Sequence, residues 1–209
     1  MRQPFRILFV CTGNMCRSPL CERLARSWLA GCGVMSIDVS SAGTHAVVGA
    51  PIYAESEVVL RRLGGDPTGF VARQLTPRIT RGADLILTAA RSHREFVQHQ
   101  TVGLCPDAVM RTFTLREFAA LTAVIPHRDI SRIDDAAGRA RVLTAAADPL
   151  RGRLAAWPQD RLDVPDPVGQ PMAVQEATAA MIADALAGPL GLIAGAPGAF
   201  PATGRDVCL

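Results

Sequence analysis

The segment from residue 5 to residue 29 constrains this chain more than any other part of its sequence. Residues 5–10, FRILFV, form a short apolar run that is rich in strand-forming residues. A polar turn that contains Gly13 follows, and apolar residues then recur at helical spacing over 20–29. Pro19 stands at an early helical position, where the N–H that proline lacks has no helical partner to lose. The segment predicts a strand, a tight loop and a helix in direct succession.

The rest of the chain alternates further strand and helix patterns. Strands are expected at 36–40, 84–88 and 109–113, and helices at 52–63, 91–100, 115–124 and 172–186. Alternating strands and helices predict an α/β fold with a parallel sheet and right-handed crossovers. Ligands bind such folds at the carboxyl ends of the strands, which is where the loop after the first strand lies.

The length of 209 residues and the hydrophobic content of 49% suit one domain with a real core. We expect a domain over residues 1–187, with an extended helical segment at about 115–160. A Gly-, Ala- and Pro-rich tail is expected over 188–209. No apolar run reaches the roughly 18 residues of a membrane span, and residues 1–10 do not form a signal peptide. These features predict a cytoplasmic protein without a membrane partner.

The charged residues and the cysteines exclude several other classes. The net charge is only +3 and the basic residues are scattered, which argues against a nucleic-acid partner. The cysteine spacing matches neither a zinc pattern nor a small disulfide scaffold, so free thiols are expected. The six are Cys11, Cys16, Cys21, Cys32, Cys105 and Cys208.

The loop after the first strand reads CTGNMCRS from Cys11 to Ser18, with five residues between the cysteine and the arginine. Hydrolysis of a phosphate monoester needs a nucleophile, a cradle for the phosphoryl oxygens and a proton donor for the leaving group. Five intervening residues let backbone N–H groups converge on one anion, and the positive end of the next helix adds to the attraction. The loop therefore predicts phosphate chemistry, with Cys11 as the nucleophile and Arg17 as a planar clamp.

The residues inside this loop are expected to form the cradle. Gly13 and Asn14 tolerate a left-handed backbone. Ser18 is placed to donate a hydrogen bond to the Cys11 thiolate and to ease its departure as a leaving group. Substrate contacts are predicted from Thr12, Gly13, Asn14, Met15, Cys16 and Ser18.

The stretch VCTGNMCRSP, residues 10–19, resembles the signature of the low-molecular-weight protein tyrosine phosphatases. The resemblance implies a flavodoxin-like three-layer fold with a central four-stranded parallel sheet flanked by helices. It also implies a cysteinyl-phosphate intermediate on Cys11 and no metal or cofactor. The expected substrate is a phosphorylated protein or a small phosphomonoester, and phosphate or vanadate should inhibit.

The family's second signature is an Asp-Pro loop that carries the general acid. Asp166-Pro167 matches it, just before the last predicted helix, and a carboxylic acid there can protonate the leaving group. Asp163 is a rival without a following proline. Asp148 precedes a proline but lies in a helical region. By the same resemblance, Ser41 in the segment SSAGT helps to hold Asn14 and the loop in shape.

Three positions depart from the family pattern. Phe70 replaces a histidine of the usual loop-bracing network, and Val168 and Gly169 replace aromatic residues that flank a phosphotyrosine ring.

Met15 favours an aryl phosphate, whereas related phosphoarginine phosphatases have Thr there. Cys16 is open to two interpretations, a protective disulfide with Cys11 or a small buried thiol. The four histidines show no ligand spacing and are read as surface or satisfied polar residues.

Two other functions compete with phosphate hydrolysis. An arsenate reductase has the same fold and loop but needs two further relay cysteines, and residues 88–100 contain none. A phospho-ligand binding module without turnover is disfavoured by the complete set of Cys11, Arg17 and Asp166. Phe70 and the altered residues after Asp166-Pro167 keep it as an alternative. A small-molecule or phosphoarginine phosphatase stays an alternative to a protein tyrosine phosphatase.

Overall fold

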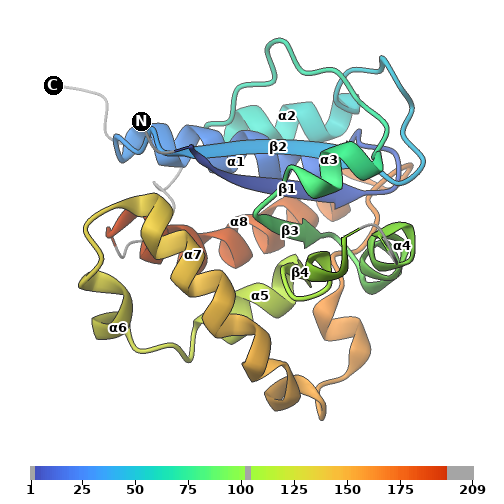
Figure 1. The fold of residues 1–209 in the computed structure, drawn as a ribbon. Helices are drawn as coiled ribbons and strands as arrows, with labels where there is room; N and C mark the ends of the chain where they lie inside the picture. The colour runs from blue at the N-terminus through green and yellow to red at the C-terminus, as the bar shows by residue number, and fades with distance from the viewer. Residues whose placement is uncertain (1–2, 102–104, 197–209) are drawn as a thin grey trace, which may run out of the picture.

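The computed structural model describes residues 3–101 and 105–196. Its centre is a four-stranded parallel sheet in the order β2-β1-β3-β4 (Figure 1). The strands are β1 Phe5–Cys11, β2 Ile37–Gly43, β3 Leu85–Thr88 and β4 Thr112–Thr114. The α-helices are α1 Arg17–Gly31, α2 Ala54–Arg62, α3 Pro77–Arg81, α4 Arg91–Thr101, α5 Leu115–Thr122, α6 His127–Ser131, α7 Ala136–Ala147 and α8 Met172–Ala194. Short 3-10 helices are η1 Pro106–Ala108, η2 Asp148–Leu154 and η3 Gln159–Leu162.

Alternate side chains of β1 divide the core into two layers. Phe5, Ile7 and Phe9 are each 1% exposed and face a core that includes buried residues of α1, α5, α7 and α8. Leu8 and Val10 face the other side, where α3 and α4 cover the sheet. This period of two is what a strand buried on both faces requires. The predicted flavodoxin-like three-layer fold is confirmed.

The register of the sheet brings the ends of three strands to one edge. Cys11 is paired with Gly43 of β2, and Val10 with Thr88 of β3. A Cβ atom on Gly43 would lie 2.4 Å from the carbonyl oxygen of Thr12, so only glycine allows this close approach. The loop after β1 is therefore set directly against the end of β2.

The predicted helical segment lies between β4 and the Asp-Pro loop and folds as α5, α6, α7, η2 and η3. Helix α5 begins with a capping box between Thr114 and Glu117. Figure 1 shows α5, α6 and α7 together on one side of the sheet, and α5 and α7 both contact α8. The segment thus adds apolar surface to the layer that contains α8.

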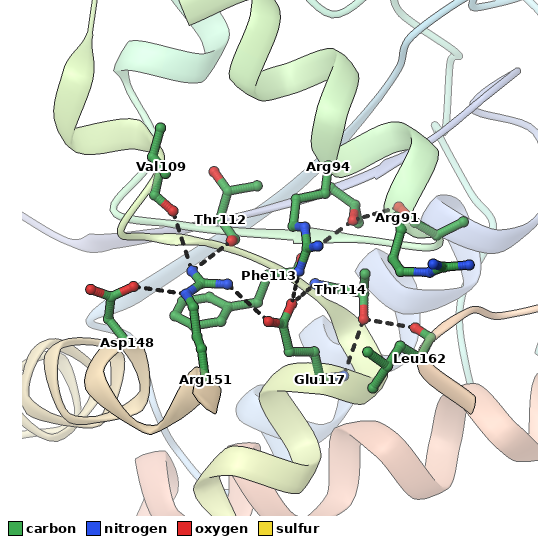
Figure 2. A network of polar contacts seen from close by, with 12 residues as sticks. Arg91, Arg94, Val109, Thr112, Phe113, Thr114, Glu117, Asp148, Arg151 and Leu162 are labelled. Atoms are coloured by element: carbon green, nitrogen blue, oxygen red, sulfur yellow. Dashed lines mark hydrogen bonds and ion pairs between the residues drawn. The ribbon is translucent and has the colours of Figure 1, made fainter. Parts of the chain in front are cut away.

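A buried carboxylate ties this segment to the sheet (Figure 2). Glu117, 4% exposed, accepts hydrogen bonds from Arg94 of α4 at 2.7 Å and from Arg151 of η2 at 2.9 Å. Arg151 also donates to the Thr112 carbonyl at 2.9 Å and lies over the Phe113 ring, 3.8 Å from its centre. Three elements far apart in sequence therefore meet around β4 through one network.

The bounds of the second and last strands were predicted wrongly, and one helix was missed. The second strand is 37–43 rather than 36–40. The last strand is 112–114 rather than 109–113, because η1 turns the chain first and leaves Val109 45% exposed. Helix α3 is too short to give a helical period, although Thr76 caps it and Pro77 opens it.

The last helix does not end at Leu186 as predicted, and it runs past the expected boundary between domain and tail at 187/188. Helix α8 continues through Pro189 to Ala194, because Leu190 and Ile193 are buried in the core. By length and composition α8 could cross a membrane, but 56% of its most apolar window is buried against the rest of the chain. Residues 197–209 of the predicted tail lie outside the described residues.

Candidate active site

Cys11 is the last residue of β1 and is only 2% exposed. Its Sγ lies 3.0 Å from the hydroxyl oxygen of Ser18, in the first turn of α1. A hydroxyl at this distance can donate to a thiolate and stabilise its charge. The structure thus places the predicted nucleophile and the predicted serine partner in contact, at the positive end of a helix.

Asn14 holds the loop in its curved shape. It is fully buried and has a positive φ of 55°, the left-handed conformation that asparagine tolerates. Its Nδ2 donates to Ser18 Oγ at 2.9 Å and to Ser41 Oγ at 2.8 Å, and its Oδ1 accepts from the Arg73 amide at 2.9 Å. One side chain therefore ties the Ser18 end of the loop to β2 and to the segment that contains Arg73.

The carbonyl groups of the loop point outward to neighbouring segments. Thr12 O accepts from the His45 amide at 3.0 Å, Gly13 O from Val47 at 3.1 Å and Met15 O from Tyr53 at 2.9 Å. In a trans peptide the N–H points opposite to the carbonyl. The next N–H groups along the chain therefore turn toward the centre of the loop, as an anion cradle requires.

Ser41 is joined to a carboxylate that the sequence did not single out. Its hydroxyl donates to Glu22 Oε2 at 2.6 Å, and Glu22 is 5% exposed and paired with Arg26 at 3.2 Å. Phe70, which stands where the family often has histidine, packs under the guanidinium of Arg23. Asn14, Ser41 and Glu22 thus brace this side of the loop.

Arg17 joins the nucleophile loop, residues 11–18, to the Asp-Pro loop, residues 163–169. Its side chain is 7% exposed, and its Nη2 donates to Asp166 Oδ2 at 2.6 Å. Its Nη1 donates to the Val164 carbonyl at 3.2 Å, whereas its buried Nε has no hydrogen-bond partner. A buried N–H without a partner is costly. A phosphoryl oxygen in the cradle would satisfy it.

Asp166 is the aspartate that the structure brings to the loop. Its side chain is 49% exposed, and Oδ1 accepts from the Val168 amide at 3.3 Å. Gly169, with a φ of 71°, closes the turn in which the Gln170 amide bonds to Pro167 O. The rival Asp163 pairs with Arg91 instead, and Asp148 pairs with Arg151.

Cys16 and Cys21 are buried near the nucleophile. Burial raises the pKa of Cys16 to about 11, against a smaller lowering by a hydrogen bond from Ser56. Burial also raises the pKa of Cys21. Both thiols therefore stay protonated at neutral pH. The five described cysteines are free, and the proposed disulfide between Cys11 and Cys16 stays a prediction.

Sequence reasoning missed that His93 lies at this site. His93 lies in the first turn of α4 and is 6% exposed, with its Nε2 2.8 Å from Thr12 Oγ1. Burial and the nearby Arg17 lower its pKa to about 4, so the imidazole is neutral at pH 7. The available signal was its place just after β3, at the same sheet edge as the loop.

Met15 and Gly13 are partly exposed at the mouth of the loop. A Cβ on Gly13 would lie 4.0 Å from Met15 and from Val47, and Val47 is 53% exposed. The mouth therefore has an apolar side.

Over residues 3–101 and 105–196, no group of three or more His, Cys, Asp or Glu side chains is placed to hold a metal ion.

Comparisons with known proteins agree with this geometry. Residues 6–130 match the sequence profile described as low molecular weight phosphotyrosine protein phosphatase. The chain is 42% identical over 87 residues to the low molecular weight protein-tyrosine-phosphatase Etp of Escherichia coli K12. That match covers 42% of this chain and 55% of the relative, so the chain spans about half of that relative's length.

Two longer matches extend across most of the chain. A protein-arginine-phosphatase of Geobacillus stearothermophilus is 32% identical over 147 residues, covering 70% of this chain and 89% of the relative. The crystal structure of a low molecular weight protein tyrosine phosphatase from T. tengcongensis superposes with a TM-score of 0.59 at 28% identity, covering 90% and 95% of the two chains. The chain therefore belongs to the low molecular weight phosphotyrosine protein phosphatase family.

Proposed function

We propose that this chain hydrolyses phosphate monoesters through a cysteinyl-phosphate on Cys11. The observation that carries the proposal is the position of Arg17, whose one side chain lies in the nucleophile loop and donates to Asp166 at 2.6 Å. Nucleophile, anion clamp and proton donor are thereby assembled at one sheet edge. A buried, pre-arranged set of donors is the usual source of catalysis in phosphoryl transfer.

The first step transfers the phosphoryl group to the protein. A lone pair of the Cys11 thiolate forms the S–P bond while the bond from phosphorus to the leaving oxygen breaks. Asp166, in its protonated form, gives its proton to that oxygen. The inward N–H groups of the loop and the Arg17 guanidinium hold the remaining phosphoryl oxygens.

The second step returns the protein to its starting state. Water attacks phosphorus, the S–P bond breaks, and the Asp166 carboxylate takes the proton from the water. The electron pair returns to Cys11 as thiolate, where the hydrogen bond from Ser18 Oγ at 3.0 Å stabilises it. Inorganic phosphate leaves, so added phosphate or vanadate should compete for the same loop.

The experiment that tests this proposal is turnover of an aryl phosphate by the wild type and by Cys11→Ser. We expect measurable turnover by the wild type and none above background by the variant. Cys32→Ser, an exposed thiol at the far end of α1, is the matched control and should keep full activity. Equal turnover by Cys11→Ser and the wild type would overturn the proposal.

Phosphotyrosine in proteins is the substrate class we propose first, on the basis of the family and of the apolar Met15 at the mouth. Phosphoarginine is the second candidate, because the arginine phosphatase of G. stearothermophilus matches over 89% of its length. The aliphatic Val168, 53% exposed, stands where an aromatic wall would favour a tyrosyl ring. Parallel assays with phosphotyrosine, phosphoserine and phosphoarginine peptides rank these classes directly.

We also infer a reducing compartment, the cytoplasm, as the place where the chain works. Five described cysteines are free thiols, which is the usual state there. A nucleophilic thiol at the heart of the site needs the same condition.

A further inference from the structure

The imidazole of His93 is buried at the edge of the active site and has an incomplete set of partners. Nε2 lies 2.8 Å from Thr12 Oγ1, whereas the buried Nδ1 has no hydrogen-bond partner. The proposed two-step mechanism uses neither nitrogen. Buried titratable groups with an unsatisfied polar atom cluster at functional sites.

Thr12 connects this imidazole to the reacting groups. Its side chain lies at the exposed lip of the loop, directly after Cys11. Its Oγ1 also lies 3.5 Å from Arg17 Nη2, the atom that contacts Asp166 at 2.6 Å. The Thr12 hydroxyl therefore lies between His93 and the pair that binds phosphate and supplies the proton.

The protonation of the imidazole follows from its surroundings. The charged and titratable groups that face it are Arg17, Asp166, Asp163 and His45, and burial together with Arg17 lowers its pKa to about 4. A neutral imidazole has one N–H. That proton belongs on Nε2, where it has an acceptor, because a buried N–H on Nδ1 would be left unsatisfied.

The hydroxyl of Thr12 then has a defined orientation. Its oxygen accepts from His93 Nε2, and the guanidinium of Arg17 can only donate to it. Both contacts use the oxygen lone pairs, so the hydroxyl proton is left to point away from both, into the mouth of the loop. A donor fixed in this way needs no reorganisation when charge develops nearby.

We propose that His93 is a positioning residue that acts through Thr12, holding its hydroxyl so that the proton points at the oxygen that leaves or attacks phosphorus. This role rests on the proposed phosphatase function. It assigns Thr12 a contact with the reacting oxygen beyond its part in the cradle. It requires no covalent step on the imidazole, which stays neutral throughout.

Steady-state kinetics with one aryl phosphate test the role. We expect His93→Ala and Thr12→Val each to lower kcat by about tenfold with KM changed by less than about twofold, since orientation rather than binding is lost. The double variant should be no slower than either single variant. His93→Gln should recover most of kcat, because its amide nitrogen can donate near the position of Nε2. His99→Ala, on the exposed face of the same helix, is the control.

Multiplicative losses in the double variant, or no rescue by His93→Gln, would show that the two residues act separately and would overturn the proposal. A readout independent of turnover is the NMR signal of the imidazole nitrogens. His93 should show the Nε2–H tautomer, stay neutral down to about pH 4, and shift in Thr12→Val while the other histidines do not.

If the His93 signal titrates at the usual pKa of histidine and does not shift in Thr12→Val, the contact between His93 and Thr12 is excluded, even where kcat falls as expected. A wild-type chain inactive on every phosphorylated substrate would refute the proposed function, and with it the role of His93 in turnover, even where the NMR signal shows the contact. The two failures are therefore distinguishable.

Discussion

The nucleophile loop and the Asp-Pro loop are built in opposite ways. The first is a continuous stretch from Cys11 to Ser18, and its thiol and hydroxyl are seven positions apart in sequence. The second reaches the site only through distant contacts: Arg17 bonds to Val164 and to Asp166 across 147 and 149 positions. Residues 115–162, most of them helical, lie between β4 and this second loop.

Side chains from several elements form hydrogen bonds and ion pairs with the Asp-Pro loop and with the residue before it. Arg91 of α4 pairs with Asp163, Arg116 of α5 donates to the Asp163 carbonyl at 3.2 Å, and Thr114 donates to Leu162 O at 2.7 Å. The Val164 amide donates to Ala89 O at 2.7 Å, so the chain before Asp166 is fixed to the residue that follows β3. The match to the family profile ends at residue 130, so it includes Ala89, Arg91, Thr114 and Arg116 but not the Asp-Pro loop that they hold. A nucleophile can thus be placed by local sequence, whereas the position of the proposed acid depends on how residues 115–162 pack.

The largest effect should come from Arg17, the one residue common to both loops. Arg17→Ala removes the phosphate clamp and the contact to Asp166, and we expect kcat/KM to fall by about 10³-fold. Arg17→Lys should recover little, because a point charge cannot replace a planar fork. Steady-state assays on an aryl phosphate measure both. Arg61→Ala, exposed on α2, should leave kcat/KM unchanged.

Asp166→Asn removes the proposed proton donor from the Asp-Pro loop and leaves the nucleophile loop unchanged. With poor leaving groups we expect kcat to fall by about 10²-fold, because only these need a proton in the transition state. With activated leaving groups the loss should stay below about fivefold. Asp148→Asn changes a different Asp-Pro pair and should leave both rates near wild type. Equal losses for the two kinds of substrate would exclude Asp166 as the acid.

Glu117→Gln tests whether the stability of the helical segment 115–162 depends on the network in Figure 2. The variant replaces the buried carboxylate shared by Arg94 and Arg151 with a neutral amide, and we expect a loss of about 2 kcal/mol of unfolding free energy in urea. The expected loss of unfolding free energy is smaller than for a fully buried ion pair, because the side chains of Arg94 and Arg151 are 23% and 26% exposed. Glu57→Gln, in an exposed pair with Arg61, should cost under about 0.5 kcal/mol.

The smallest effect is expected from Arg91→Ala. Its pair with Asp163 is about a quarter exposed on both sides, so its loss should loosen the Asp-Pro loop only slightly. We expect about a threefold fall in kcat for poor leaving groups and no change for activated ones. Arg78→Ala, on exposed α3, is the control. A uniform loss on both substrates would place Arg91 in overall stability rather than in acid positioning.

Sequence reasoning performed unevenly in the two regions, for a physical reason. The strand, loop and helix around Cys11 follow from hydrophobic period and from residue types within one short stretch, and the structure has them there. The end of α8 was misjudged because Gly188 and Pro189 disfavour a helix locally, whereas burial of Leu190 and Ile193 favours it. His93 carried no local pattern at all, since its partner Thr12 is 81 positions away.

The sequence by itself determined the chemistry at Cys11, because a nucleophile, a curved anion cradle and an arginine clamp fit within consecutive residues. The Asp-Pro pattern also favoured Asp166 as the acid, but only the tertiary structure shows which arginine each candidate aspartate meets. Asp148, Asp163 and Asp166 have the same carboxyl group, and each meets a different arginine: Arg151, Arg91 and Arg17. Those pairings depend on how α4, α5 and η2 pack around the sheet, which no local pattern contains.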